Sequence, residues 1–325
     1  MAQNAIGRKE RKYSVVSYSK YGYLFVAPFF IAFAVFTLYS LFFTFKISFT
    51  DLTNLNFKAI NNVGLANYKR MFDPNDILCI NFWIAFKNTV IIWLVNFVPQ
   101  ITLALILASW FTSTSLRIKG KGAFKMMMFM PNIITAATLA ILFYSLFNYP
   151  IAPVNTLLQQ LGLLNTPYEF YRSTTASRGL ISFIQFWMWY GNTMIILIAG
   201  ILGINPALFE AAMLDGCNGR QTFAKITLPL LKPILLYNLV TSMIGGLQMF
   251  DIPYLLTRGN PNGTTDTVAR FIYLQAFEGS FNYNIASTAS VVLFGVILVL
   301  SAILFWIMRD RDTTTAKKAE RRAVK

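Results

Sequence analysis

A run of residues without a single charge begins at Tyr21 and continues to Phe45. These 25 residues would measure about 38 Å as an α-helix, because each residue adds about 1.5 Å along the axis. The hydrocarbon core of a bilayer is roughly 30 Å thick. The run is therefore long and apolar enough to predict a membrane-spanning helix.

Five further apolar runs of the same character follow. We expect them to cross the membrane at residues 88–110, 126–147, 180–202, 233–250 and 285–308. Hydrophobic residues make up 56% of the 325-residue chain and charged residues only 13%, which is too apolar for a water-soluble domain of this size. The predicted fold is an all-α polytopic membrane protein with six transmembrane helices within residues 21–308. Pro131 can kink the third of these helices.

The basic residues lie between the apolar runs and predict the orientation of the chain. In a six-span arrangement, 19 of the 28 lysines and arginines fall on one side of the membrane. They lie in residues 1–20, 117–125, 220–232 and 309–325. By the positive-inside rule this side is the cytoplasm, so we expect two charged cytoplasmic tails, at residues 1–20 and 309–325. The net charge of +15 does not indicate nucleic-acid binding, because the basic residues are not gathered on one folded face.

Several classes of chemistry are excluded by residue types that the chain lacks. It has no histidine, which rules out His-based zinc sites and catalytic triads. Its two cysteines, Cys79 and Cys217, are expected in loops on opposite faces of the membrane, so they cannot form a disulfide with each other. No phosphate-binding G-x-x-x-x-G-K-[ST] motif occurs. We therefore expect that the chain is not an enzyme and binds no cofactor of its own.

A polar stretch between the fourth and fifth runs predicts a short exposed helix. Asn205 can cap its start, Pro206 suits its first position, and Gly216 can end it in a left-handed conformation. The helix would have about three turns and would carry Glu210 and Asp215 among small and apolar residues. These residues alone allow two interpretations. The helix can rest at the bilayer interface, or it can lie in the groove of a partner whose cations bind the carboxylates.

The same stretch contains a spaced pattern that begins with Glu-Ala-Ala at residues 210–212. Gly216 follows after three intervening residues, and Ile-x-Leu-Pro at 226–229 follows after nine more. The pattern resembles the cytoplasmic EAA loop in the membrane subunits of bacterial ATP-binding-cassette importers, and every fixed position matches. The resemblance implies a coupling loop at residues 204–232 that docks on a separate ATPase, which would bind ATP and magnesium. The coupling residues it implies are Asn205, Pro206, Glu210, Ala211, Ala212, Asp215, Gly216, Ile226, Leu228 and Pro229.

Two expected outer loops carry further resemblances. Residues 64–68 read GLANY, which is similar to the GLxNY element of the carbohydrate-importer branch of this family. Residues 256–261 read LTRGNP, which is similar to its LT-x-GGP loop with Asn260 in place of the second glycine. Without the resemblance, both stretches are equally well explained as connecting loops.

Taken together, these elements resemble the maltose-permease-like half of a carbohydrate importer in the bacterial cytoplasmic membrane. This implies a second permease subunit, two copies of a cytoplasmic ATPase and an extracellular or periplasmic solute-binding protein as partners.

Two polar and aromatic stretches interrupt the apolar runs on either side of the EAA loop, at residues 185–193 and 248–254. Aromatic faces stack on sugar rings, and amides and carboxylates bond sugar hydroxyls, so the combination suits a saccharide. Such residues also occur at membrane interfaces and between packed helices. The resemblance to maltose-type permeases places sugar contacts at Trp189, Asn192, Gln248 and Met249, and Asp251 is added for its chemistry.

The predicted function is the permease subunit of an ATP-driven importer that receives a sugar or oligosaccharide from a solute-binding protein. The same machinery importing a sugar phosphate or a polyol is the closest alternative. A secondary carrier would need ionisable residues within its spans, whereas here they fall at or near the span ends. A membrane scaffold would not need polar aromatic stretches inside its spans.

Overall fold

The computed structural model describes residues 19–57, 60–113, 119–150, 152–279 and 281–308. Regular structure within these residues is helical, apart from one isolated antiparallel bridge between Thr50 and Asn62. This agrees with the predicted all-α class. The predicted tails lie outside the described residues, except that Ser19 and Lys20 begin the first helix.

Several helical stretches among the described residues are long and apolar enough to cross a membrane. There are five of them, at Tyr21–Ser48, Ile77–Thr112, Thr174–Leu202, Lys232–Leu256 and Tyr283–Met308. A sixth is obtained when the bent helix pair Lys121–Ile133 and Ala136–Phe147 is counted as one span. The chain is thus a multi-pass protein with five or six candidate membrane helices.

The chain divides into two compact units, of which one ends at Lys46 and the other begins at Ile47. In the first unit, α1 (Ser19–Ala32), the π-helical segment η1 (Phe33–Leu38) and most of α2 (Tyr39–Ser48) follow one another without a break. The helix predicted over residues 21–45 is therefore confirmed.

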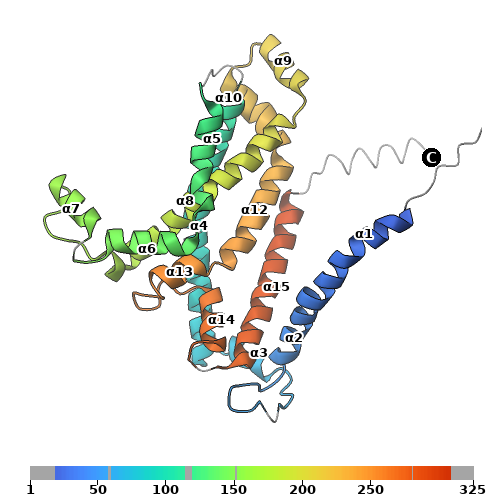
Figure 1. Cartoon of the computed structure of the whole chain (residues 1–325), viewed down its shortest axis with the longest axis vertical. Coiled ribbons are helices and arrows are strands. Elements are labelled where there is room, and N and C mark those ends of the chain that lie inside the picture. Colours follow the sequence, from blue (N-terminus) through green and yellow to red (C-terminus); the bar gives the residue numbers. More distant parts are fainter. Residues whose placement is uncertain (1–18, 58–59, 114–118, 151, 280, 309–325) are drawn as a thin grey trace, which may run out of the picture. The chain divides into compact units, whose positions relative to one another are not determined.

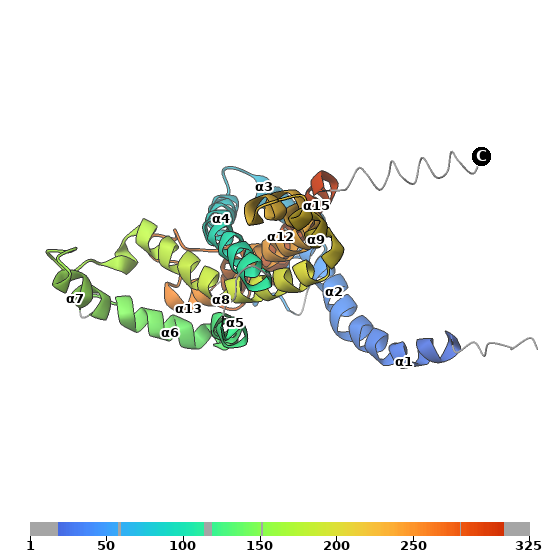
Figure 2. The same cartoon turned by 90° about the horizontal axis from the view of Figure 1, so that it is seen from above.

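Four long helices form the frame of the second unit. They are α4 (Ile77–Thr112), α8 (Thr174–Leu202), α12 (Lys232–Leu247) and α15 (Tyr283–Met308). The helix α4 packs along α8, and α12 lies between α4 and α15 (Figures 1 and 2). Three apolar clusters join these helices, with Phe82, Met243 and Ile285 in the first, Ile92, Leu139 and Ile181 in the second, and Ala104, Met194 and Leu231 in the third. In lipid such helices are held together by close van der Waals packing, because the surrounding chains are as apolar as the side chains.

Short helices occupy the connections. They are α3 (Ala66–Phe72), α7 (Pro153–Gln160), η3 (Phe170–Arg172), α9 (Pro206–Leu214), α10 (Gly219–Thr222), η4 (Phe223–Thr227), α11 (Leu228–Leu230), α13 (Asp251–Leu256) and α14 (Val268–Ala276). Figure 1 shows α9 and α10 at the upper end of the second unit, and α3 and α14 at its lower end. The expected coupling loop and the expected outer loops therefore lie at opposite ends of the helices.

The third predicted span is broken rather than kinked. The helix α5 (Lys121–Phe129) runs into the 3-10 turn η2 (Met130–Ile133), and α6 (Ala136–Phe147) then starts at an angle of 88° to it. Pro131 contributes to the break because it has no N–H to continue the helical ladder. Thr135 then caps a new helix, its Oγ1 accepting from the Thr138 N–H at 3.3 Å. The span predicted over residues 126–147, with a possible kink at Pro131, is therefore bent by 88° at a short break between two helices.

The helix α4 begins well before the predicted residue 88. Asp76 caps it, its carboxylate accepting from the Leu78 N–H at 2.9 Å. That bond, together with the bond from Arg70, keeps the pKa of Asp76 below its usual value. Cys79 consequently lies buried in the first turn of α4 and not in a loop as expected. The prediction started the span at Asn88, directly after the charged Lys87, whereas the helix already begins at Ile77 and includes Lys87.

Candidate functional site

A cavity of about 500 Å³ lies between α4, α8, α12 and the segment that follows α12. This volume falls within the roughly 300–1,000 Å³ that is common for small-molecule sites. All five side chains that were predicted to contact substrate line the cavity, namely Trp189, Asn192, Gln248, Met249 and Asp251. The structure thus brings together residues from both sides of the EAA pattern.

The contribution of α8 comes from one face of that helix. Gln185, Trp189 and Asn192 are spaced by four and three residues, so they neighbour one another on the helix surface. Trp189 is 46% exposed, which leaves its ring free to stack on a flat apolar surface. The neighbouring residues Tyr190 and Met194 are buried on another side of α8, so the packing of α8 determines which of its faces is left open.

The segment after α12 reaches the cavity because the helix is interrupted there. The helix α12 ends at Leu247, Phe250 has a non-helical backbone (φ −130°, ψ −53°), and α13 starts at Asp251. The span predicted over residues 233–250 thus lies within the helical stretch Lys232–Leu256, which is interrupted locally at residues 248–250. The interruption leaves Gln248 and Asp251 exposed at the cavity, while Met249 is only 6% exposed and packs in the apolar core.

The helix α4 supplies a polar stripe that the sequence analysis missed. Trp93, Asn96 and Gln100 line the cavity and are three and four residues apart, which places them on one face of α4. The Nε2 of Gln100 donates to Thr193 Oγ1 of α8 at 2.8 Å. Three polar or amphipathic residues at helical spacing in an otherwise apolar run were the signal that could have identified this stripe.

A second missed stripe runs along α12. Tyr237, Asn238, Thr241 and Ser242 line the cavity at positions that recur every three to four residues. The Oγ of Ser242 accepts a hydrogen bond from Trp93 Nε1 of α4 at 3.2 Å, which links the two stripes. With these residues the lining consists mainly of amides, hydroxyls and aromatic rings. It can hydrogen-bond and stack on a polar solute that carries many hydroxyl groups.

The predicted short helix is present at one end of the second unit as α9. The side chain of Asn205 accepts from the Ala207 N–H at 3.0 Å, and Pro206 occupies the first position. Gly216 ends the helix with a φ of +73°, and its N–H donates to Met213 O at 3.1 Å. The Cys217 N–H donates to Ala212 O at 2.9 Å, which completes a Schellman motif. Both ends of α9 are therefore fixed by local hydrogen bonds.

The polar residues of the EAA pattern are exposed. Glu210, Ala211, Asp215 and Gly216 face solvent, whereas Ala212 is only 3% exposed. Leu214, which the pattern does not single out, is 90% exposed. Acidic groups and a large uncovered apolar side chain at one helix end are the features expected of a docking surface.

The second half of the loop folds back toward the long helices. Asn218 and Gln221 form a capping box with two bonds of 2.9 Å, which starts α10. Ile226 is half-buried, and Leu228 and Pro229 are exposed. The structure thus places every predicted coupling residue in one loop at one end of the second unit.

The C-terminal end of this loop, at Leu231, packs against helices that line the cavity. Leu231 is fully buried in the same cluster as Leu197 and Ile201 of α8. A Cβ added at Gly200 of α8 would come within 2.4 Å of the side chain of Ile234 in α12. The helices α8 and α12 therefore pack closely against each other at the base of the loop that carries α9.

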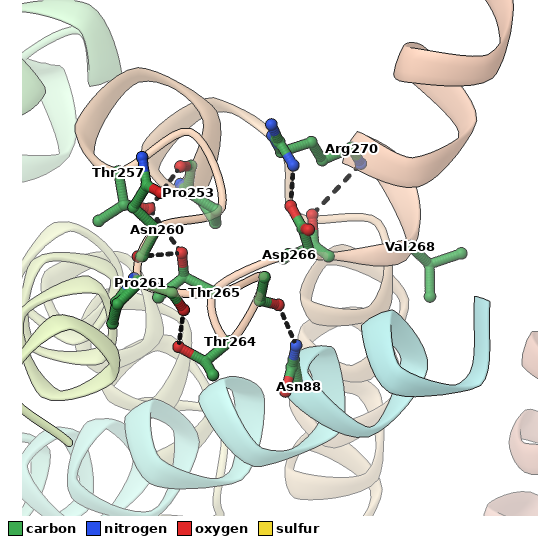
Figure 3. Close-up of polar contacts among 12 residues, drawn as sticks. Asn88, Pro253, Thr257, Asn260, Pro261, Thr264, Thr265, Asp266, Val268 and Arg270 are labelled. Carbon is green, nitrogen blue, oxygen red and sulfur yellow. Dashed lines mark hydrogen bonds and ion pairs between the residues drawn. The ribbon is translucent and has the colours of Figure 1, made fainter. Parts of the chain in front are cut away.

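The loop that resembles LT-x-GGP is fastened to α4 and α8 by backbone contacts. Asn88 of α4 donates to the carbonyl of Gly263 at 2.9 Å, and Asp266 pairs with Arg270 within the loop (Figure 3). Arg178 of α8 donates to Thr264 O at 2.8 Å and to Asn88 Oδ1 at 2.6 Å. These contacts make the loop an ordered surface at the end of the unit opposite α9.

In the GLANY element, Asn67 is buried and holds the preceding segment. Its Nδ2 donates to the carbonyls of Ser48 and Thr50 at 2.9 and 2.8 Å. The element therefore fixes the backbone of the loop it belongs to.

Residues 80–310 match the protein family described as "Binding-protein-dependent transport system inner membrane component". Among curated proteins, a lactose transport system permease protein of Rhizobium radiobacter is 34% identical over 296 residues, which cover 90% of this chain and 96% of the relative. An arabinooligosaccharides transport system permease protein of Bacillus subtilis is 31% identical over 284 residues, which cover 86% of each chain.

Two solved structures have a similar fold. One is a chain of a bacterial ABC transporter involved in the import of the acidic polysaccharide alginate, with a TM-score of 0.74, 24% identity and coverage of 90% of this chain and 96% of that one. The other belongs to a bacterial alginate ABC transporter in complex with an alginate pentasaccharide-bound periplasmic protein, with a TM-score of 0.69, 23% identity and coverage of 90% and 94%.

Proposed function

Because the chain belongs to the family of binding-protein-dependent transport system inner membrane components, we propose that it is the permease subunit of an ATP-driven importer of a sugar or oligosaccharide. The observation that carries the proposal is the cavity between α4, α8 and α12, whose lining combines amides, hydroxyls and aromatic rings inside otherwise apolar helices. A sugar leaving water needs partners for its hydroxyls, and these side chains can supply them. Relatives that are named for lactose and for arabinooligosaccharides support the same class of solute.

In this proposal the chain crosses the bacterial cytoplasmic membrane six times, with the bent pair around Pro131 as the third crossing. Both termini and the loop that carries α9 face the cytoplasm, where most lysines and arginines of the chain would then lie. The end that carries α3 and α14 faces outward and receives the solute-binding protein. The separation of α9 from these loops along the long helices supports this arrangement.

The proposed partners are a second permease subunit and two copies of a cytoplasmic ATPase, which binds ATP and magnesium. Closure of the ATPase would push on α9, whose capped ends make it a rigid lever. The tight contact between Gly200 and Ile234 would pass this movement to α8 and α12 together. The cavity would then open alternately to the two sides of the membrane.

The test is transport by the complete complex in vesicles. The chain, the second permease and the ATPase are reconstituted with the binding protein, and labelled neutral sugars including lactose are supplied. We expect sugar to move away from the binding protein into the compartment that contains ATP. Movement driven by a proton or sodium gradient without ATP would indicate a secondary carrier instead. ATP hydrolysis without movement of any sugar would refute the assignment of the solute.

A further inference from the structure

The cavity lining contains a negatively charged side chain but no positively charged one among the described residues. Asp251 lines the cavity and is exposed to it, and no lysine or arginine is among the lining residues in the described part of the chain. The other polar lining groups are neutral amides and hydroxyls. A solute in this cavity would therefore meet one negative charge and no positive charge from this subunit.

Two basic residues on the cavity helices, Lys87 and Arg178, are directed elsewhere. On α4, Lys87 precedes Asn96 by nine residues, which corresponds to half a turn around the helix axis at about 100° per residue, so it projects from the opposite side. On α8, Arg178 precedes Gln185 by seven residues, or about 10 Å along the axis. Its guanidinium is already engaged by Asn88 Oδ1 and the carbonyl of Thr264. Arg178 thus holds the outer loop.

The position of Asp251 keeps its carboxylate available. It starts α13 directly after the interruption of α12, and its side chain is exposed at the cavity. A carboxylate in this position can accept hydrogen bonds from one or two sugar hydroxyls, and bonds to a charged acceptor are about twice as strong as neutral ones. A carboxylate or phosphate on the solute would instead be desolvated beside a like charge without a cation to compensate it.

We infer that Asp251 makes this cavity selective for neutral saccharides and excludes acidic ones, such as uronates and sugar phosphates. The inference rests on the proposed function and narrows its solute class. It also separates this chain from the structurally similar transporter that imports an acidic polysaccharide, since the shared fold leaves the charge of the cavity undetermined. Rejection by an unpaired like charge is a common way of achieving specificity.

The experiment measures sugar binding to the assembled complex of both permeases and the ATPase, without the binding protein, so that only the membrane part selects. The probes are matched pairs that differ only at C6, galactose with galacturonate and glucose with glucuronate, titrated by ligand-observed NMR. The wild-type complex should bind each neutral sugar about tenfold or more tightly than its uronate, since about 1.4 kcal/mol of repulsion corresponds to a factor of ten. In Asp251→Asn the preference should fall to less than about threefold, mainly because the uronates bind better.

Asp73→Asn is the matched control. It removes the same charge from an exposed outer loop, and an asparagine there can still accept the bond that Asp73 takes from the Asn75 N–H at 3.0 Å. It should leave the preference unchanged. Equal binding of neutral and acidic sugars by the wild-type complex, or an unchanged preference in Asp251→Asn, would overturn the inference and leave the sugar importer standing. Failure of every sugar to bind a complex that still hydrolyses ATP would overturn both.

Discussion

A methyl group added at Gly246 should move the Trp93 ring that lines the cavity. A Cβ at this position would lie 2.1 Å from Trp93 Cδ1 and 2.6 Å from Cγ, far inside any normal contact. The ring cannot simply turn aside, because it donates to Ser242 Oγ at 3.2 Å and stacks on Phe97 with centroids 5.7 Å apart. We therefore expect Gly246→Ala to displace the indole and to break this hydrogen bond.

The size of the effect follows from opposing contributions. Overpacking of a well-filled site costs about 1–3 kcal/mol, and the lost hydrogen bond adds about 1 kcal/mol. Replacing a helical glycine by alanine stabilises the helix by about 0.5–1 kcal/mol, which offsets part of this cost. The net destabilisation of Gly246→Ala should thus be about 1–3 kcal/mol.

The adjacent Gly245 is the matched control, because an added Cβ would meet no described atom within 4 Å. Gly245→Ala should be more stable than the wild type by about 0.5–1 kcal/mol, because alanine is favoured over glycine within a helix. Thermal unfolding of the purified complex in detergent should therefore order the melting temperatures as Gly245→Ala, wild type and Gly246→Ala, from high to low. The half-saturating sugar concentration for transport should rise in Gly246→Ala, because Trp93 lines the cavity.

A double-mutant cycle with Trp93→Phe tests whether the clash is the cause. The smaller ring leaves room for the new methyl group, so the double mutant Gly246→Ala, Trp93→Phe should be more stable than the sum of the single effects by about 0.5–2 kcal/mol. If Gly246→Ala melts together with Gly245→Ala, or if the cycle shows no coupling, the proposed contact between Gly246 and Trp93 is wrong.

Three further predictions concern the proposed coupling to the ATPase and the proposed binding of the solute. Glu210→Lys reverses an exposed charge on α9 and should leave ATPase activity intact while reducing sugar uptake at least about tenfold; normal coupling would argue against the lever. Gly216→Ala forces a side chain into φ +73° at a cost of about 1 kcal/mol and should weaken the coupling of ATP hydrolysis to transport. Gly219→Ala, at an ordinary φ, is the control and should leave coupling unchanged. If both variants have equal effects in a coupled ATPase assay, backbone strain is not the cause. Gln248→Leu should abolish uptake while the complex still assembles on size-exclusion chromatography, and unchanged uptake would remove Gln248 from the solute contacts.

The helix α9 is the part of the structure that could be predicted most completely. Asn205, Pro206 and Gly216 each act on neighbouring backbone groups, so the start and end of α9 are encoded within about ten residues. The long helices were predictable for a related reason, since a bilayer requires runs of apolar residues whatever the helices pack against. Boundaries were missed where a local cap outweighed a charge, as at Asp76 before Lys87.

The sequence by itself therefore determined the membrane class, most of the helices and the residue types available for a polar solute, because hydropathy and capping depend on near neighbours. Only the tertiary structure decided that Trp93, Asn96 and Gln100 face the same cavity as Asn192 and Gln248, because this depends on how α4, α8 and α12 rotate against one another. Close contacts such as Gly246 against Trp93 set that rotation, and no pattern within one helix records them. The 88° break after Pro131 belongs to the same category, since a proline allows a bend whose angle is set by the helices around it.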